Sequence, residues 1–222
     1  MRLSPTPRSC GLSLKRGLRS ASLQRVDPFL DLEAWCASAL PGVGLHDHFG
    51  PTRAEHLLRF ELGAPHENCT QERVDQATDR ASTIFEKVFS AEAPIDLVIF
   101  DYRAASESTE LDLYAALPPG LRFHERILGP SDNRSGELPQ RLARLARGSI
   151  DHRTIFRAIA NTEMGFQPRL AQALSFHGRS TGQCFYMYDD RGCVVAGAPQ
   201  DALVARFGDW VIQRNPRRRT GR

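Results

Sequence analysis

Residues 184–197 constrain the fold more than any other part of this sequence. The segment Cys-Phe-Tyr-Met-Tyr-Asp-Asp-Arg-Gly-Cys-Val-Val-Ala-Gly places aromatic and β-branched residues on both sides of the polar group 189–192. Aromatic and β-branched residues favour strands, an aspartate can start a turn, and Gly192 can adopt a positive φ. The sequence therefore predicts a β-hairpin here, although a hairpin by itself predicts no reaction.

Hydrophobic periodicity predicts helices and strands along the rest of the chain. Residues 95–100 form a nearly continuous apolar run, which is typical of a central strand covered on both faces. An apolar stripe at helical spacing predicts the strongest helix over 70–89. The other expected elements are helices over 29–40, 111–117, 151–161 and from 199 onward, and strands over 56–63, 121–128 and 170–176. We expect a loop over 129–139 and find few signals over 140–147.

The order of these elements favours an α+β fold over a doubly wound parallel sheet. We expect a single mixed, largely antiparallel sheet with helices packed on it. The C-terminal part should be a β-hairpin followed by a helix.

The positive charge of the chain is concentrated at its two ends. The whole chain has 29 Lys and Arg against 26 Asp and Glu. Six of the basic residues lie in 1–26 and five in 214–222, and neither segment contains an acid. Residues 27–213 therefore retain 18 basic and 26 acidic residues, a net charge of −8. We expect one acidic domain over 27–213 between two basic, disordered tails.

The cysteines and the apolar runs indicate an intracellular protein. The five cysteines are odd in number and form no Cys-x-x-Cys pair, which fits reduced thiols better than a disulfide framework. No apolar run approaches the roughly 20 residues that a membrane-spanning helix needs. The N-terminus also lacks the apolar core of a secretory signal. We expect a cytoplasmic protein with no membrane partner.

Four motifs carry a resemblance to a known family. They are Arg-Phe-Glu-Leu-Gly at 59–63, Leu-Val-Ile-Phe-Asp-Tyr-Arg at 97–103, Arg-Ala-Ile-Ala-Asn at 157–161, and Met-Tyr-Asp-Asp-Arg-Gly-Cys at 187–193 followed by Asp-Trp at 209–210. Together they resemble the bacterial domain of unknown function family numbered 3885 over roughly residues 54–212. The resemblance implies a compact intracellular domain without a known cofactor, and it implies no mechanism.

Two charged clusters supply the candidate binding residues. These are Tyr188, Asp189, Asp190 and Arg191 at the hairpin turn, and Asp101 and Arg103 after the predicted central strand. An arginine beside carboxylates can lower their pKa or bind an anionic group through two hydrogen bonds. A purely structural turn, in which Asp189 or Asp190 accepts hydrogen bonds from backbone amides, explains the first cluster equally well. If the hairpin lies next to the strand 95–100, the two clusters converge at one rim of the sheet.

Motifs for catalysis and metal binding are weak. His46 and His48 could supply two metal ligands from one extended segment, but no third ligand follows at a recognisable spacing. The sequence contains no G-x-S-x-G, Walker or G-x-G-x-x-G motif. We therefore assign no catalytic residue, no metal and no cofactor.

Three functions fit these observations. The leading hypothesis is a non-enzymatic protein-binding module, of immunity or antitoxin type, whose acidic surface binds a basic partner. The alternative is a hydrolase or nucleotide-processing enzyme that uses the hairpin cluster with Asp101 or Glu61, which requires a cleft that gathers these carboxylates. The third is weak nucleic-acid binding through the basic tails, which the acidic domain disfavours.

Overall fold

The computed structural model describes residues 26–45, 57–90, 92–102, 111–130, 136–197 and 200–212. In chain order, its elements are α1 (Pro28–Ala39), β1 (Leu57–Glu61), α2 (Gln71–Val88), β2 (Pro94–Asp101), η1 (Leu113–Ala116), β3 (His124–Leu128), β4 (Leu138–Ala146), η2 (Arg147–Ser149), α3 (His152–Met164), β5 (Gln172–Gly178), β6 (Gln183–Asp189), β7 (Gly192–Ala196), α4 (Asp201–Phe207) and η3 (Gly208–Trp210). The two predicted basic tails, apart from Val26, and the segment from His46 to His48 lie outside the described residues.

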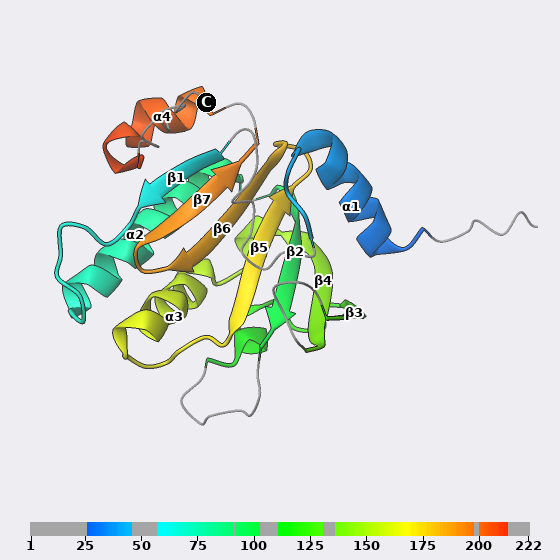
Figure 1. The fold of residues 1–222 in the computed structure, drawn as a ribbon, viewed down its shortest axis with the longest axis horizontal. Coiled ribbons are helices and arrows are strands. Elements are labelled where there is room, and N and C mark those ends of the chain that lie inside the picture. Colours follow the sequence, from blue (N-terminus) through cyan, green and yellow to red (C-terminus); the bar gives the residue numbers. More distant parts are fainter. Residues whose placement is uncertain are drawn as a thin grey trace, which may run out of the picture.

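The seven strands form one open sheet in the order β1-β7-β6-β5-β2-β4-β3 (Figure 1). All six pairings between neighbouring strands are antiparallel. The predicted α+β class, with a largely antiparallel sheet and a C-terminal hairpin followed by a helix, is confirmed.

Strand β4 is the element that the sequence analysis missed. The expected loop over 129–139 and the weak signals over 140–147 instead contain a nine-residue strand between β2 and β3. Its apolar alternation is interrupted by Arg141 and Arg144, which form ion pairs with Asp101 and Asp96 of β2. Because these partners lie 40 and 48 positions earlier in the chain, local periodicity does not reveal them.

Helices cover both faces of the sheet. On one face, α2 and α3 bury an aromatic cluster in which the ring of Phe85 lies 5.3 Å from Phe156, 4.9 Å from Phe176 and 5.3 Å from Phe185. Figure 1 shows α2 behind β1 and β7. On the other face, α1 buries Leu32 and other apolar side chains against a second cluster that includes residues of β2 and β4.

Side-chain caps mark where α1 and α2 begin. Asp27 accepts a hydrogen bond from the Phe29 amide at 2.8 Å and so caps α1, while Thr70 caps α2 in the same way. Helix α3 ends at Gly165, whose φ of 76° is the left-handed conformation that glycine adopts readily. None of the described helices combines the length and the apolar character that crossing a membrane requires.

Candidate binding site at the hairpin rim

Asp189 closes the turn of the β6–β7 hairpin. Its Oδ1 atom accepts hydrogen bonds from the backbone amides of Arg191, at 2.8 Å, and Gly192, at 3.2 Å. Its Oδ2 atom accepts a hydrogen bond from Arg191 Nε at 2.7 Å. The side chain of Asp189 is therefore occupied by the turn itself, as in the structural alternative that the sequence allows.

Asp190 lies in the interior, with none of its surface exposed. Its Oδ2 atom lies 2.5 Å from Arg73 Nε, and Arg73 Nη1 donates a hydrogen bond to the carbonyl oxygen of His66 at 2.7 Å. Gly63 makes room for this guanidinium, because a Cβ atom at that position would lie 2.6 Å from Arg73 Cζ. Asp190 thus connects the hairpin turn to the start of α2 and is not available to a partner on the surface.

Arg191 and Tyr188 are the accessible members of the first cluster. The Arg191 side chain is 64% exposed. Tyr188 is half-buried, and its hydroxyl accepts a hydrogen bond from Arg59 Nε at 2.7 Å. Burial raises the pKa of Tyr188 to about 12, so its phenol stays neutral at physiological pH.

Asp101 belongs to the same end of the sheet but to a separate ion-pair system. Strands β2 and β6 both pair antiparallel with β5, so they run in the same direction and end at the same rim. The premise that the hairpin lies next to residues 95–100 is wrong, because β5 separates them. Asp101 pairs instead with Arg141 of β4, at 3.0 Å. Arg103 lies outside the described residues.

Strands β5 and β6 separate toward this rim. Their pairing extends only from Gly178–Gln183 to Phe176–Phe185, and Figure 1 shows the two strands diverging beyond it. A cavity of about 70 Å³ lies there, and Gln172 and Tyr188 are among its lining residues. The Oε1 atom of Gln172 is buried and accepts no hydrogen bond from the described residues. A cavity of this size with an unsatisfied acceptor can hold ordered water.

The surface of the rim is acidic. We use "hairpin rim" for the turn 189–192, the loop 62–70 with the first turn of α2, and the C-terminal end of α3 (163–166). The loop is attached to α3 through a hydrogen bond from the Cys69 amide to Met164 Sδ, at 3.1 Å. The exposed acids of the rim are Glu67, Glu72 and Glu163, and the exposed base is Arg191.

The carboxylates named in the enzymatic alternative each have partners of their own. Asp189, Asp190 and Asp101 each have a different arginine partner. Glu61 accepts hydrogen bonds from the backbone amides of Gly63 and Ala64, at 3.2 and 3.1 Å. Within the described residues, no group of three or more histidine, cysteine, aspartate or glutamate side chains could hold a metal ion. Each of these carboxylates is therefore already engaged by an arginine or by backbone amides.

The sequence was compared with models of known protein families, and one family model matches it. The family model described as Domain of unknown function (DUF3885) matches residues 52–215, well over half of the chain. The chain belongs to the DUF3885 family. This confirms the resemblance carried by the four sequence motifs. Searches of curated proteins and of solved structures found no match.

The DUF3885 match covers the sheet but not helix α1. It includes all seven strands and every residue of the hairpin rim. Helix α1 precedes the match, although its apolar face packs on the same sheet. The helix on this face of the sheet is thus contributed by a segment outside the region that defines the family.

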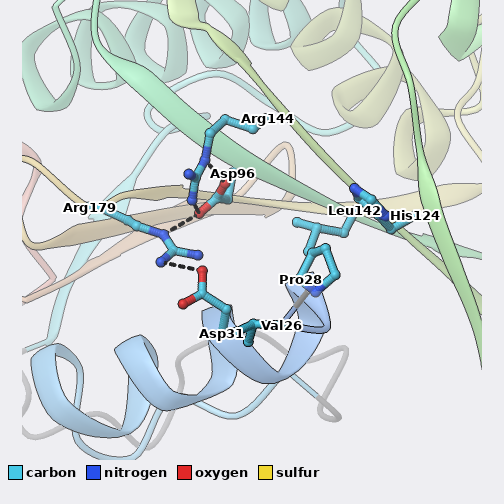
Figure 2. Close-up of a pocket in the computed structure, with 8 residues that line it drawn as sticks. All are labelled: Val26, Pro28, Asp31, Asp96, His124, Leu142, Arg144 and Arg179. Atoms are coloured by element: carbon cyan, nitrogen blue, oxygen red, sulfur yellow. Dashed lines mark hydrogen bonds and ion pairs between the residues drawn. The ribbon is translucent and has the colours of Figure 1, made fainter. Parts of the chain in front are cut away.

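A second charged site in this DUF3885 protein lies beneath α1 and was missed by the sequence analysis. Asp96 of β2 is only 3% exposed. Arg144 donates to both of its oxygens, from Nε at 2.7 Å and from Nη2 at 3.0 Å, and Arg179 Nε donates at 2.7 Å (Figure 2). Asp96 is the one charged residue in the apolar run 95–100, and that was the available signal, because a buried charge requires a partner.

The two arginines determine the protonation of Asp96. Burial by itself raises the pKa of this carboxyl, but the hydrogen bonds and charges of Arg144 and Arg179 outweigh burial and hold the pKa below its usual value. Asp96 is therefore ionised at physiological pH, and it can orient both guanidinium groups.

Proposed function

We propose that this protein is a non-enzymatic binding module that recognises a partner protein with a basic surface through the hairpin rim. The observation that supports this proposal most directly is that the carboxylates of the rim fall into two groups. Asp189 and Asp190 already form hydrogen bonds or ion pairs within the protein. In contrast, Glu67, Glu72 and Glu163 are exposed and have no ion pair among the described residues. Carboxylates of this second kind are available to an incoming cation.

The charge of the domain supports the same partner chemistry. The described residues contain 21 Asp and Glu against 15 Lys and Arg. A surplus of negative charge raises the rate at which a positively charged partner is captured and disfavours acidic competitors. An inhibitor of a basic protein, such as an immunity or antitoxin protein, would use a surface of this kind.

The location of the rim also suits recognition. Loops held by a rigid sheet are common binding surfaces. Here the loop 62–70 is held by the Arg73–Asp190 ion pair and by the bond from Cys69 to Met164. We place this function in the cytoplasm, which fits the free thiols of the four described cysteines.

The test is affinity capture with isosteric charge removal. The full chain is immobilised and exposed to a lysate of its source organism at low salt, and the captured proteins are identified by mass spectrometry. The rim variant carries Glu67→Gln, Glu72→Gln and Glu163→Gln. The matched control variant carries Glu92→Gln, Glu137→Gln and Asp201→Asn, three exposed acids away from the rim.

We expect the wild-type and control proteins to capture the same basic protein, and the rim variant to lose it. The interaction should weaken as salt rises, because the contacts are between exposed charges. Circular dichroism must show that the variants remain folded. Equal capture by the rim variant, or the absence of any specifically captured basic protein, would contradict the proposal.

A further inference from the structure

We infer that Arg144 and Arg179 form a binding site for a small carboxylate, and that Asp31 of α1 occupies part of this site in the structure. The site lies at the opposite end of β2 from Asp101 and the hairpin rim. The inference is therefore independent of the proposed function.

Asp96 orients both arginines toward the same space. It receives hydrogen bonds from the Nε atoms of Arg144 and Arg179 and from Arg144 Nη2. The second terminal nitrogen of Arg144 has no hydrogen bond to the described residues, and the Arg144 side chain is 55% exposed. A guanidinium held rigidly on one edge, with its other edge free, is arranged to bind a planar anion.

Charge balance explains why an anion should bind here. Asp96 supplies one negative charge for two guanidinium groups. The second negative charge comes from Asp31, whose Oδ2 atom lies 2.8 Å from Arg179 Nη1. The Asp31 side chain is 51% exposed, so its pair with Arg179 is of the weak, solvent-screened kind. Another carboxylate can replace it at little cost.

The origin of Asp31 supports this interpretation. Asp96, Arg144 and Arg179 belong to the region 52–215 that matches the family, whereas Asp31 lies outside it. The family region by itself thus presents two arginines around one carboxylate. Helix α1 adds the carboxylate of Asp31, which neutralises the second positive charge.

The space beside the arginines is large enough for more than a carboxylate. A pocket of about 370 Å³ is lined by the charged residues and by Val26, Pro28, His124 and Leu142. Figure 2 shows the Arg179 guanidinium between Asp96 and Asp31, with Pro28 and Leu142 on another side of the pocket. Pockets of this volume bind small organic molecules. The preferred ligand is a small molecule with a carboxylate and a compact apolar body.

The experiment measures benzoate binding by the full-length protein, with inorganic phosphate as a second probe at the same ionic strength. Binding is followed through the arginine Nε–Hε signals in nitrogen-15 NMR spectra. We compare the wild type with Asp31→Asn, which removes the internal carboxylate, and with the double variant Asp31→Asn, Arg144→Lys. The control is Asp75→Asn, which breaks the exposed ion pair between Asp75 and Arg157 and so leaves the Arg157 guanidinium without this partner.

We expect Asp31→Asn to bind benzoate about five- to tenfold more tightly than the wild type, the gain from losing a weak competing ion pair. The double variant Asp31→Asn, Arg144→Lys should lose this gain in benzoate affinity, because lysine retains the charge but cannot bind a carboxylate through two hydrogen bonds. Asp75→Asn should behave as the wild type.

Three results would overturn the inference. They are no saturable binding to Asp31→Asn, the same gain in Asp75→Asn, and a gain that persists with Arg144→Lys in a protein shown to be folded. Tighter binding of phosphate than of benzoate by Asp31→Asn would overturn the assignment to a carboxylate.

Discussion

Arg73 and Asp190, which are 117 positions apart in the chain, form an enclosed ion pair that attaches the β6–β7 turn to the start of α2. Arg73 Nε lies 2.5 Å from Asp190 Oδ2. The other oxygen, Oδ1, is buried and accepts no hydrogen bond from the described residues. The contact explains why the most distinctive turn of the sequence contains two adjacent aspartates, since Asp189 closes the turn and Asp190 holds it against α2.

Replacing Asp190 by asparagine should strongly destabilise the protein. The variant leaves the Arg73 guanidinium enclosed without a counter-charge, a change that typically costs about 3–5 kcal/mol. The free energy of unfolding from urea titrations measures the effect. The control is Asp79→Asn, which breaks the exposed pair with Arg153 and should cost about 1 kcal/mol or less. A loss no larger than that of the control would contradict a stabilising role for the buried pair.

His177 should make stability fall in mild acid. Burial beneath α1 lowers the pKa of its imidazole to about 4, and its ring nitrogens lie 3.8 Å from Cys36 Sγ and 2.9 Å from Ser175 Oγ. In the unfolded chain a histidine takes up a proton near pH 6.5, so the unfolded state binds more protons as the pH falls below that value. The contribution of His177 to the free energy of unfolding should therefore be constant above about pH 7 and decrease between about pH 6.5 and 4, by on the order of 3 kcal/mol in total.

The variant His177→Gln isolates this contribution. Urea unfolding of the wild type and of the variant is measured at intervals across the same pH range. The difference between the two proteins should change with pH, because only the wild type titrates at this position. Asp96 stays ionised in this range because its pKa is held below the usual value. Parallel pH profiles would exclude His177 as the titrating group.

Gly197 should not tolerate a side chain. Its φ is +99°, and a Cβ atom would lie 2.1 Å from the carbonyl oxygen of Gly182. The variant Gly197→Ala combines an unfavourable backbone conformation with a clash against backbone, for which we expect a loss of about 3 kcal/mol or more. Gly208→Ala is the matched control, since its added Cβ would meet no atom within 4 Å beyond the neighbouring backbone. Thermal and urea unfolding should show little change for the control, and equal effects of both substitutions would refute this packing.

Helix α1 should unfold together with the family domain. Leu32 is fully buried between α1 and the sheet, whereas Leu30 on the same helix is 59% exposed. Leu32→Ala should lower the free energy of unfolding by about 2–5 kcal/mol, and Leu30→Ala should leave it nearly unchanged. Both variants are compared by urea unfolding followed by circular dichroism. If Leu32→Ala has no effect on the global transition, α1 detaches before the domain unfolds.

Much of the fold could be predicted from local patterns. The central strand β2, the long helix α2 and the β6–β7 hairpin follow from apolar periodicity, capping residues and turn residues that lie within a few positions of one another. Strand β4 could not be predicted in this way, because Arg141 and Arg144 disguise its alternation and their partners are on β2.

The candidate sites were predicted less completely. The sequence drew attention to the hairpin turn, and the turn is indeed at a charged rim. It could not show that Asp190 is buried while Arg191 is exposed, because that difference depends on Arg73. The exposed glutamates of the rim and the arginine pair around Asp96 become recognisable only when distant segments are brought together.

The sequence by itself determined that the chain forms an α+β domain with a hairpin near its C-terminus, and its motifs identified the family. Only the tertiary structure decided that β5 separates the hairpin from β2, and which carboxylates are enclosed. The physical reason is the range of the interactions. Turn and helix preferences act over a few residues, whereas the ion pairs of Asp96 and Asp190 join residues 48, 83 and 117 positions apart.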